Sequence, residues 1–132
     1  MGRLETTSFD LILPVPLHPR RERERGFNQA GLLAARVSRL CCIPLGRKDC
    51  MRVRDTRPQT GLRAAERRRN VSGAFAVPHP ERVRGMRLLL VDDVLTTGAT
   101  AGACARALTN AGATGVWVLT LARARPAWTD VL

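Results

Sequence analysis

Residues 88–100, LLLVDDVLTTGAT, constrain the fold of this chain more than any other segment. The segment opens with four consecutive apolar residues, Leu88 to Val91, and an apolar run without alternation is typical of a strand that is buried on both faces. Such strands occur in parallel sheets, where right-handed crossover helices cover the two faces. The segment therefore predicts an α/β protein.

The rest of the chain repeats the alternation of strand and helix. Apolar runs predict strands over residues 9–16 and 115–122, and the second of these is expected to be buried with Trp117 in the core. Helical spacing predicts a helix over residues 28–40 with Asn28 as N-cap, and another over residues 100–111 that Gly112 ends. The fold class is α/β, with a mainly parallel twisted sheet flanked by helices.

The remaining segments carry weaker signals. Pro14 and Pro16 are expected to end the first strand, and the charged run that closes at Gly26 is expected to be a loop. Strand material around residues 50–53 and 71–77 is short. Residues 56–70 contain few apolar anchors, so we expect a mobile lid within about residues 52–75.

The length of 132 residues suits a single domain spanning residues 1–132. No apolar stretch approaches the roughly 20 residues that cross a bilayer, and residues 1–13 lack the pattern of a secretory signal. We therefore expect no membrane contact and a cytoplasmic protein. Its four cysteines include no C-x-x-C pair and are expected to be reduced.

Positive charge is concentrated in one window. The formal net charge is +11, and residues 20–69 hold 15 basic and 5 acidic residues, a net charge of +10. Arginine presents a fork of donors that suits phosphate oxygens, so this window predicts an anionic partner. Composition leaves open whether that anion is a nucleic acid or a small polyphosphate.

The end of the central apolar run carries the chemistry. Asp92 and Asp93 follow it directly, at the carboxyl end of a predicted parallel strand, where open α/β sheets bind ligands. Adjacent buried carboxylates call for ligand hydroxyls or a hydrated Mg²⁺. The glycine bend at Gly98 then leads into a helix N-terminus, which cradles anions. We interpret the segment as a pocket for a ribose 5-phosphate, rather than a simple cap or turn.

Three blocks of sequence support a family resemblance. LLLVDDVLTTGAT resembles the signature with which type I phosphoribosyltransferases bind 5-phosphoribosyl 1-pyrophosphate (PRPP). PVPLHPRRERERGFNQAGLLA and RPQTGLRAAERRRNVSGAF, together with that signature, resemble the ComF/GntX-type competence-protein family over residues 9–125. Members commonly carry an N-terminal zinc ribbon with C-x-x-C pairs, which this chain lacks; we expect that the module is lost or that the chain is a fragment.

The resemblance implies a role for each matching residue. Asp92 and Asp93 would be the catalytic residues, and they would face the ribose hydroxyls and the Mg²⁺ that accompanies PRPP. The 5-phosphate would be held by Thr96, Thr97, Gly98, Ala99 and Thr100. The pyrophosphate loop and its lid would supply Leu17, His18, Arg20, Arg21, Arg25 and Arg57.

Three functions stay open at this point. The first is a phosphoribosyltransferase that binds PRPP with Mg²⁺, transfers the phosphoribosyl group to an unidentified acceptor and releases pyrophosphate. The second is a module that senses PRPP or a nucleotide without turnover. The third is a competence protein that contacts single-stranded DNA or a helicase partner through residues 20–69, although three Phe, two Trp and no Tyr argue against a stacking groove. By analogy with type I relatives we also expect a homodimer.

Overall fold

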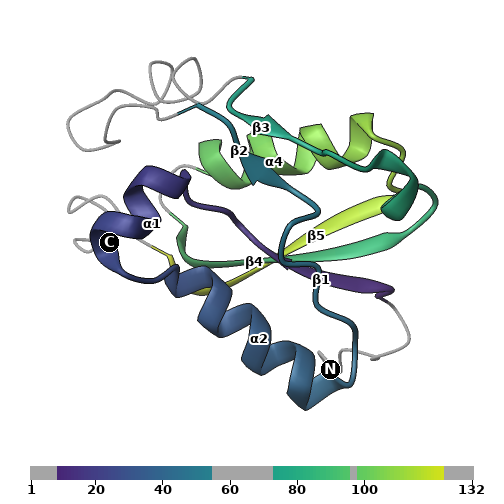
Figure 1. The fold of residues 1–132 in the computed structure, drawn as a ribbon. Helices are drawn as coiled ribbons and strands as arrows, with labels where there is room; N and C mark the ends of the chain where they lie inside the picture. The colour runs from purple at the N-terminus through teal and green to yellow at the C-terminus, as the bar shows by residue number, and fades with distance from the viewer. Residues whose placement is uncertain (1–8, 55–72, 96–97, 124–132) are drawn as a thin grey trace, which may run out of the picture.

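The computed structural model describes residues 9–54, 73–95 and 98–123 of the chain (Figure 1). In chain order its elements are β1 (Leu11–Pro14), α1 (Pro19–Arg25), α2 (Gln29–Cys41), β2 (Met51–Arg52), β3 (Phe75–Ala76), the 3₁₀ turn η2 (Pro80–Arg82), β4 (Arg87–Leu95), α4 (Ala99–Asn110) and β5 (Gly115–Arg123).

A parallel sheet with the strand order β1-β4-β5 forms the centre of the molecule. Leu11 of β1 pairs with Leu88 of β4, and Leu89 pairs with Trp117 of β5. Ile12 of β1 also forms an isolated parallel β-bridge with Leu45. The carboxyl ends of the three strands therefore share one edge, and the α/β fold class predicted from the sequence is confirmed.

The four apolar residues of β4 pack alternately on two faces of the sheet. Leu88 and Leu90 are fully buried in the cluster that faces α4, whereas Leu89 and Val91 face α2. Burial of a leucine side chain stabilises a fold by about 2 kcal/mol, so this strand anchors both layers. The absence of alternation in the sequence follows from this two-sided burial.

A small antiparallel sheet of β2 and β3 lies against the α4 layer (Figure 1). Cys50, Ala74 and Phe75 at this sheet are buried in the same cluster as Leu88 and Leu90. The weak strand signals around residues 50–53 and 71–77 thus correspond to two-residue strands. Most of the predicted lid, residues 55–72, lies outside the described residues, and the domain assignment stays a prediction.

The predicted loop after β1 is wrong in part, because residues 19–25 form the helix α1. The side chain of His18 accepts the N–H of Arg20, and Pro19 stands at the first helical position. Gly26 closes the helix in the left-handed conformation, with φ +84°. None of the helix residues is buried, so apolar periodicity could not reveal it.

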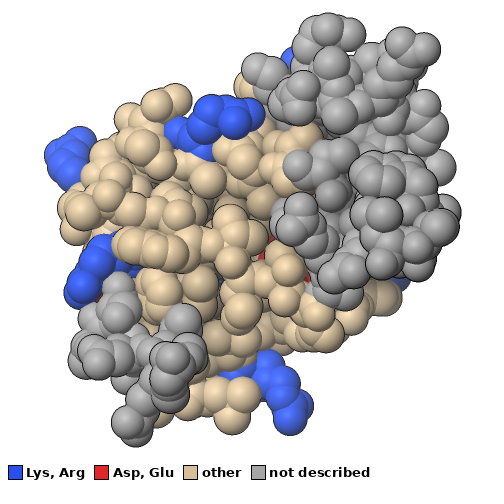
Figure 2. All heavy atoms as spheres, turned by 180° about the vertical axis from the view of Figure 1, so that it is seen from behind, with Lys and Arg blue, Asp and Glu red and all other residues tan. Residues whose placement is uncertain are grey.

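The prediction that β5 is buried is also wrong. Trp117 is 49% exposed and Leu121 is 69% exposed, although the edge of the Trp117 ring packs on Phe9. The reason is position: β5 is an edge strand of the described sheet, and α2 contacts β1 and β4. Seen from behind, the part of the surface left clear by the grey residues is mostly uncharged, with basic side chains around its rim (Figure 2).

The two longer helices confirm their predictions. The side chain of Asn28 caps α2, and Gly112 follows α4 with φ +111°. Among the helices that the structure describes, none is long and apolar enough to cross a membrane.

Candidate functional site

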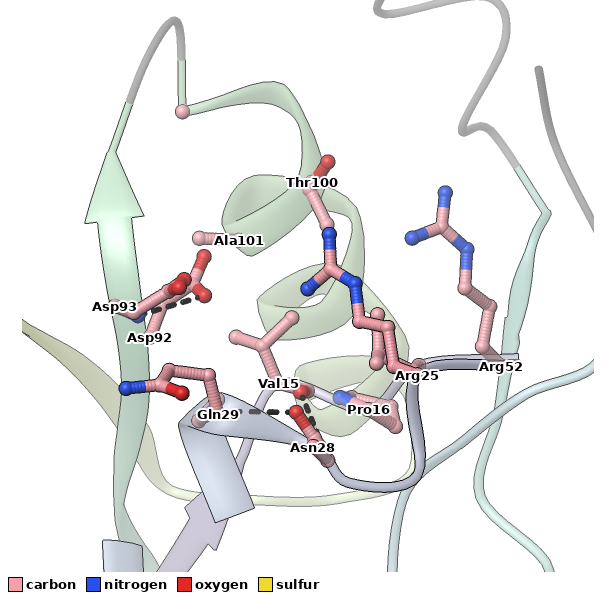
Figure 3. A pocket seen from close by; sticks show the side chains of 13 residues that line it. Val15, Pro16, Arg25, Asn28, Gln29, Arg52, Asp92, Asp93, Thr100 and Ala101 are labelled. Atoms are coloured by element: carbon pink, nitrogen blue, oxygen red, sulfur yellow. Dashed lines mark hydrogen bonds between the residues drawn. The ribbon is translucent and has the colours of Figure 1, made fainter. Parts of the chain in front are cut away.

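A cavity of about 270 Å³ opens at the carboxyl edge of the sheet (Figure 3). The strand ends of β1 and β4 and the first turns of α2 and α4 surround it. It is lined by Val15, Pro16, Leu17, Arg25, Asn28, Gln29, Ala30, Arg52, Asp92, Asp93, Gly98, Thr100 and Ala101.

The acidic pair forms one wall of this cavity. Asp92 and Asp93 are partly buried on β4, and the backbone N–H of Asp93 donates to Oδ1 of Asp92 at 2.9 Å. Burial raises the pKa of Asp92 to about 7, and the neighbouring carboxyl of Asp93 adds to the rise. The site therefore holds two negative charges poorly, and a cation or hydroxyl donors in the cavity would relieve them.

The first turn of α4 forms a second wall. Gly98 stands at its N-cap with φ +81°, a left-handed conformation that suits glycine, and Thr100 and Ala101 line the cavity. The backbone N–H groups of a first helical turn have no acceptor within the helix, and they lie at the positive end of its dipole. This wall is suited to an anion.

The N-terminus of α2 faces the same cavity. Asn28 fixes it in place, because its side chain accepts the N–H of Ala30 at 3.2 Å and donates to the carbonyl of Val15 at 3.4 Å. The strand end of β1 is thereby tied to the helix start. Gln29 projects beside the two carboxylates (Figure 3).

Two arginines complete the lining. Arg25 is the last residue of α1, and Arg52 lies on β2 with its guanidinium 5.3 Å from the centre of the Phe75 ring. The positive charge of Arg52 also lowers the pKa of Asp92, against the larger effect of burial. The sequence did not single out Arg52, because a two-residue strand carries no periodic signal.

The structure brings together six of the predicted site residues in this cavity: Leu17, Arg25, Asp92, Asp93, Gly98 and Thr100. His18 instead caps α1, and Arg20 lies in the first turn of that helix, with its Nε 3.6 Å from Oε1 of Glu24. Ala99 is buried in the core cluster, and Arg21 of α1 does not line the cavity. Thr96, Thr97 and Arg57 lie outside the described residues.

Asn28, Gln29 and Ala30 also line the site without having been predicted there. The signal for them was present, because a helix that follows a parallel strand begins at the carboxyl edge of the sheet, where ligands bind. An N-cap at Asn28 could therefore have placed the next two residues in the pocket. Among the described residues, no group of three or more His, Cys, Asp or Glu side chains is arranged to hold a metal ion.

Comparison with protein families identifies the Phosphoribosyl transferase domain over residues 25–131. Competence protein F of Haemophilus influenzae is 40% identical over 116 residues, covering 87% of this chain and 51% of that protein. DNA utilization protein YhgH of Escherichia coli K12 is 40% identical, and the match covers 86% of this chain and 49% of that protein. Competence protein ComFC of Bacillus subtilis is 36% identical, and the match covers 77% of this chain and 39% of that protein. The chain thus spans about half the length of the first two relatives.

Two solved structures share the fold. Phosphoribosylpyrophosphate synthetase of Mycobacterium smegmatis superposes with a TM-score of 0.56 at 14% identity, over 98% of this chain and 33% of that one. Glutamine phosphoribosylpyrophosphate amidotransferase of B. subtilis superposes with a TM-score of 0.55 at 22% identity. The match covers 86% of this chain and 22% of that one. At these identities the likeness concerns the fold alone.

Proposed function

This chain belongs to the phosphoribosyl transferase domain family, in its ComF-type competence branch, and from that premise we propose that its cavity binds PRPP. One observation carries the proposal: a carboxylate pair lies between two helix N-termini that line the same cavity. PRPP has the complementary pattern, with a phosphate at one end, a diphosphate at the other and ribose hydroxyls between them. Asp92 and Asp93 would accept the hydroxyl hydrogen bonds.

The first turn of α4 would take the 5-phosphate. Thr100 adds a hydroxyl to the backbone donors of that turn, and Gly98 lets the chain bend into it without steric conflict. Of the five residues expected to hold this phosphate, the described residues support Gly98 and Thr100. Thr96 and Thr97 remain expectations from the sequence.

The part of the cavity lined by arginine would take the diphosphate. Arg25 and Arg52 supply cations there, and the positive end of α2 adds to their field. Negative charge builds on the diphosphate as its bond to C1 of the ribose breaks through an oxocarbenium-like transition state. The two arginines would stabilise that developing charge.

The acidic pair also fits Mg²⁺. Magnesium prefers oxygen ligands and is usually held by one or two carboxylates together with substrate phosphates and water. Asp92 and Asp93 supply such oxygens, and the raised pKa of Asp92 marks a place where a cation would be stabilising. When bound, Mg²⁺ would supply positive charge to the diphosphate oxygens.

The test is the binding of PRPP by isothermal titration calorimetry, with and without Mg²⁺. We expect Mg²⁺-dependent binding that falls at least tenfold in the variant Asp92→Asn/Asp93→Asn. Asp10→Asn is the matched control, because Asp10 lies at the opposite edge of the same sheet and pairs with Arg87. Unchanged affinity in the double variant would overturn the assignment of the site.

Release of pyrophosphate separates transfer from sensing. We propose transfer to an acceptor, and expect pyrophosphate when PRPP is incubated with a panel of nucleobases and amines. Binding of PRPP without release for any acceptor would favour the sensing module instead.

A role in DNA uptake is the second candidate, and the names of the relatives favour it. Proteins called competence protein and DNA utilization protein are 36–40% identical to this chain. The described part of the basic window exposes arginines on α1 and α2, including Arg23, Arg36 and Arg39. We propose that this surface contacts single-stranded DNA or an acidic partner such as a helicase.

A further inference from the structure

Two cysteines meet in the core beneath the proposed site. The Sγ atoms of Cys50 and Cys104 lie 3.3 Å apart, and the residues are 54 positions apart in the chain. Their exposed fractions are 3% and 0%. Both thiols are free in the structure, so a buried contact joins two distant segments that have no covalent link.

Each cysteine is close in sequence to a residue that lines the cavity. Cys50 comes two positions before Arg52, and Cys104 lies one helical turn after Ala101 on α4. The contact therefore joins the β2 wall of the site to the α4 wall. A covalent bond at this contact would tie the two walls together directly.

A neighbouring cavity gives small molecules access to one of the thiols. This second cavity has a volume of about 460 Å³, and Cys50 is part of its lining. It adjoins the first cavity, since both are lined by Pro16, Leu17, Asn28 and Arg52. Cys50 thus borders a cavity large enough for a peroxide, whereas Cys104 is fully buried and is not part of its lining.

We propose that Cys50 and Cys104 are a redox switch, in which a peroxide converts the contact into a disulfide and weakens ligand binding in the adjoining cavity. The disulfide itself does not depend on the function proposed above, but its effect on PRPP does.

The chemistry balances with hydrogen peroxide as the oxidant. The sulfur of Cys50 attacks one peroxide oxygen, which breaks the O–O bond and gives a sulfenic acid and water. The sulfur of Cys104 then attacks the sulfenic sulfur, and the hydroxyl leaves with the thiol proton as a second water. Two thiols and one peroxide become one disulfide and two waters.

The environment of Cys104 suits it to the second step, the attack on the sulfenic sulfur of Cys50. Its hydrogen bond with Cys50, together with burial, raises the pKa of the Cys104 thiol well above its usual value. A thiol of raised pKa is a poor first nucleophile, since the thiolate is the reactive form. Cys104 is nevertheless positioned to resolve a sulfenic acid that forms on Cys50.

Bond formation would displace the walls of the site. A disulfide holds its sulfur atoms about 2.05 Å apart, so the contact must shorten by about 1.2 Å. Displacements of about 1 Å in a binding site are enough to lower its efficiency strongly. We expect Arg52 to shift towards α4 and the Kd for PRPP with Mg²⁺ to rise at least fivefold.

The test oxidises the full chain with hydrogen peroxide in the background Cys41→Ser/Cys42→Ser, because Cys42 is exposed and would compete for the oxidant. Peptide mapping by mass spectrometry should find the Cys50–Cys104 cross-link and the loss of two hydrogens, both reversed by dithiothreitol. Closing so long a loop should raise the Tm by about 5 °C or more. If Cys50 and Cys104 stay reduced after extended exposure, or if cross-links form only between two copies of the chain, the proposal is overturned.

Binding measurements decide whether the disulfide is a switch. Oxidised and reduced protein are titrated with PRPP and Mg²⁺, and Cys104→Ala is treated in parallel as the control that cannot form the bond. Equal affinity before and after cross-linking would overturn the switch. Absence of PRPP binding in both states would instead contradict the proposed function while leaving the mapped disulfide intact.

Discussion

Asp92 combines burial with a like-charged neighbour, and both act on its ionisation. Its pKa rises from 3.8 to about 7, mainly through burial and then through the side chain of Asp93. Between about pH 4 and pH 7 the native protein therefore binds more protons at this residue than the unfolded chain does. Its contribution to stability falls as the pH rises through that window, which is the opposite of an ordinary salt-bridged carboxylate.

The variant Asp92→Asn should remove this penalty. We expect its free energy of unfolding, relative to that of the wild type, to increase by on the order of 1 kcal/mol between pH 5 and pH 8, after allowing for the partial exposure of the group. Urea denaturation at the two pH values measures the change. The same variant should bind PRPP poorly. Asp92 would thus lower the stability of the fold at neutral pH while contributing to ligand binding.

Asp10→Asn is again the matched control. The backbone N–H of Arg87 lowers the pKa of Asp10, so its contribution is present at neutral pH and is lost as the pH falls. Asp10→Asn should therefore gain no stability between pH 5 and pH 8. An equal gain in both variants would mean that net charge, and not the burial of Asp92, is responsible.

At the residue scale, the sequence predicted the acidic pair of the candidate site but not Arg52. Asp92 and Asp93 follow a strand whose unbroken apolar run indicates burial, so their place at the sheet edge could be inferred. Arg52 could not be inferred, because its position depends on the packing of a two-residue strand against Phe75. Contacts of this kind depend on tertiary structure, which short patterns do not encode.

At the element scale, the site is built from helix ends. α2 and α4 both begin at the cavity, and α1 ends there with Arg25. The two longer helices are anchored by buried alanines, whereas α1 buries no residue. The position of Arg25 therefore depends on the caps of a seven-residue helix.

Gly26→Ala should weaken the C-terminal cap of α1. Gly26 has φ +84°, and no atom lies within 4 Å of the position that a Cβ would take there, so the effect is backbone strain alone. We expect a loss of about 1 kcal/mol in the free energy of unfolding and a several-fold rise in the Kd for PRPP, because Arg25 is the residue just before the cap. Urea denaturation and calorimetric titration measure the two effects.

Gly31→Ala, inside α2, is the matched control. A Cβ there would make ordinary contacts of 3.5 Å or more with Asn28. We expect this variant to be neutral or to gain up to about 1 kcal/mol, since alanine favours the helix. Equal losses at Gly26 and Gly31 would contradict the role assigned to the cap.

Elements without an apolar pattern, or with a misleading one, were the ones predicted wrongly. α1 is entirely polar, so its only sequence signals were Pro19 at the start and Gly26 at the end. β5 has the apolar pattern of a buried strand, yet whether it is buried depends on which elements cover it. The helices α2 and α4 were predicted because each packs into the core from a periodic apolar face, and the central strand was predicted because its unbroken apolar run is buried on both faces.

At the scale of the whole molecule, a large positive charge stands beside exposed apolar side chains on an edge strand. The formal net charge is +11, and Trp117, Leu119 and Leu121 of β5 are exposed. A net charge of this size attracts polyanions at long range and is screened by salt. Contact with single-stranded DNA through residues 20–69 should therefore depend strongly on ionic strength.

The variant Arg36→Ala/Arg39→Ala tests that contact on the exposed side of α2. Fluorescence anisotropy with a labelled single-stranded oligonucleotide should give binding at 50 mM salt that weakens more than tenfold at 200 mM salt, as expected when about four phosphates are neutralised. The variant should lower the affinity and flatten the salt dependence.

Arg84→Ala/Arg106→Ala is the matched control. It removes the same charge outside the window, so its effect on DNA binding should be smaller. Equal effects of the two double variants would assign binding to net charge alone, and absence of binding at 50 mM salt would exclude direct contact between this chain and DNA.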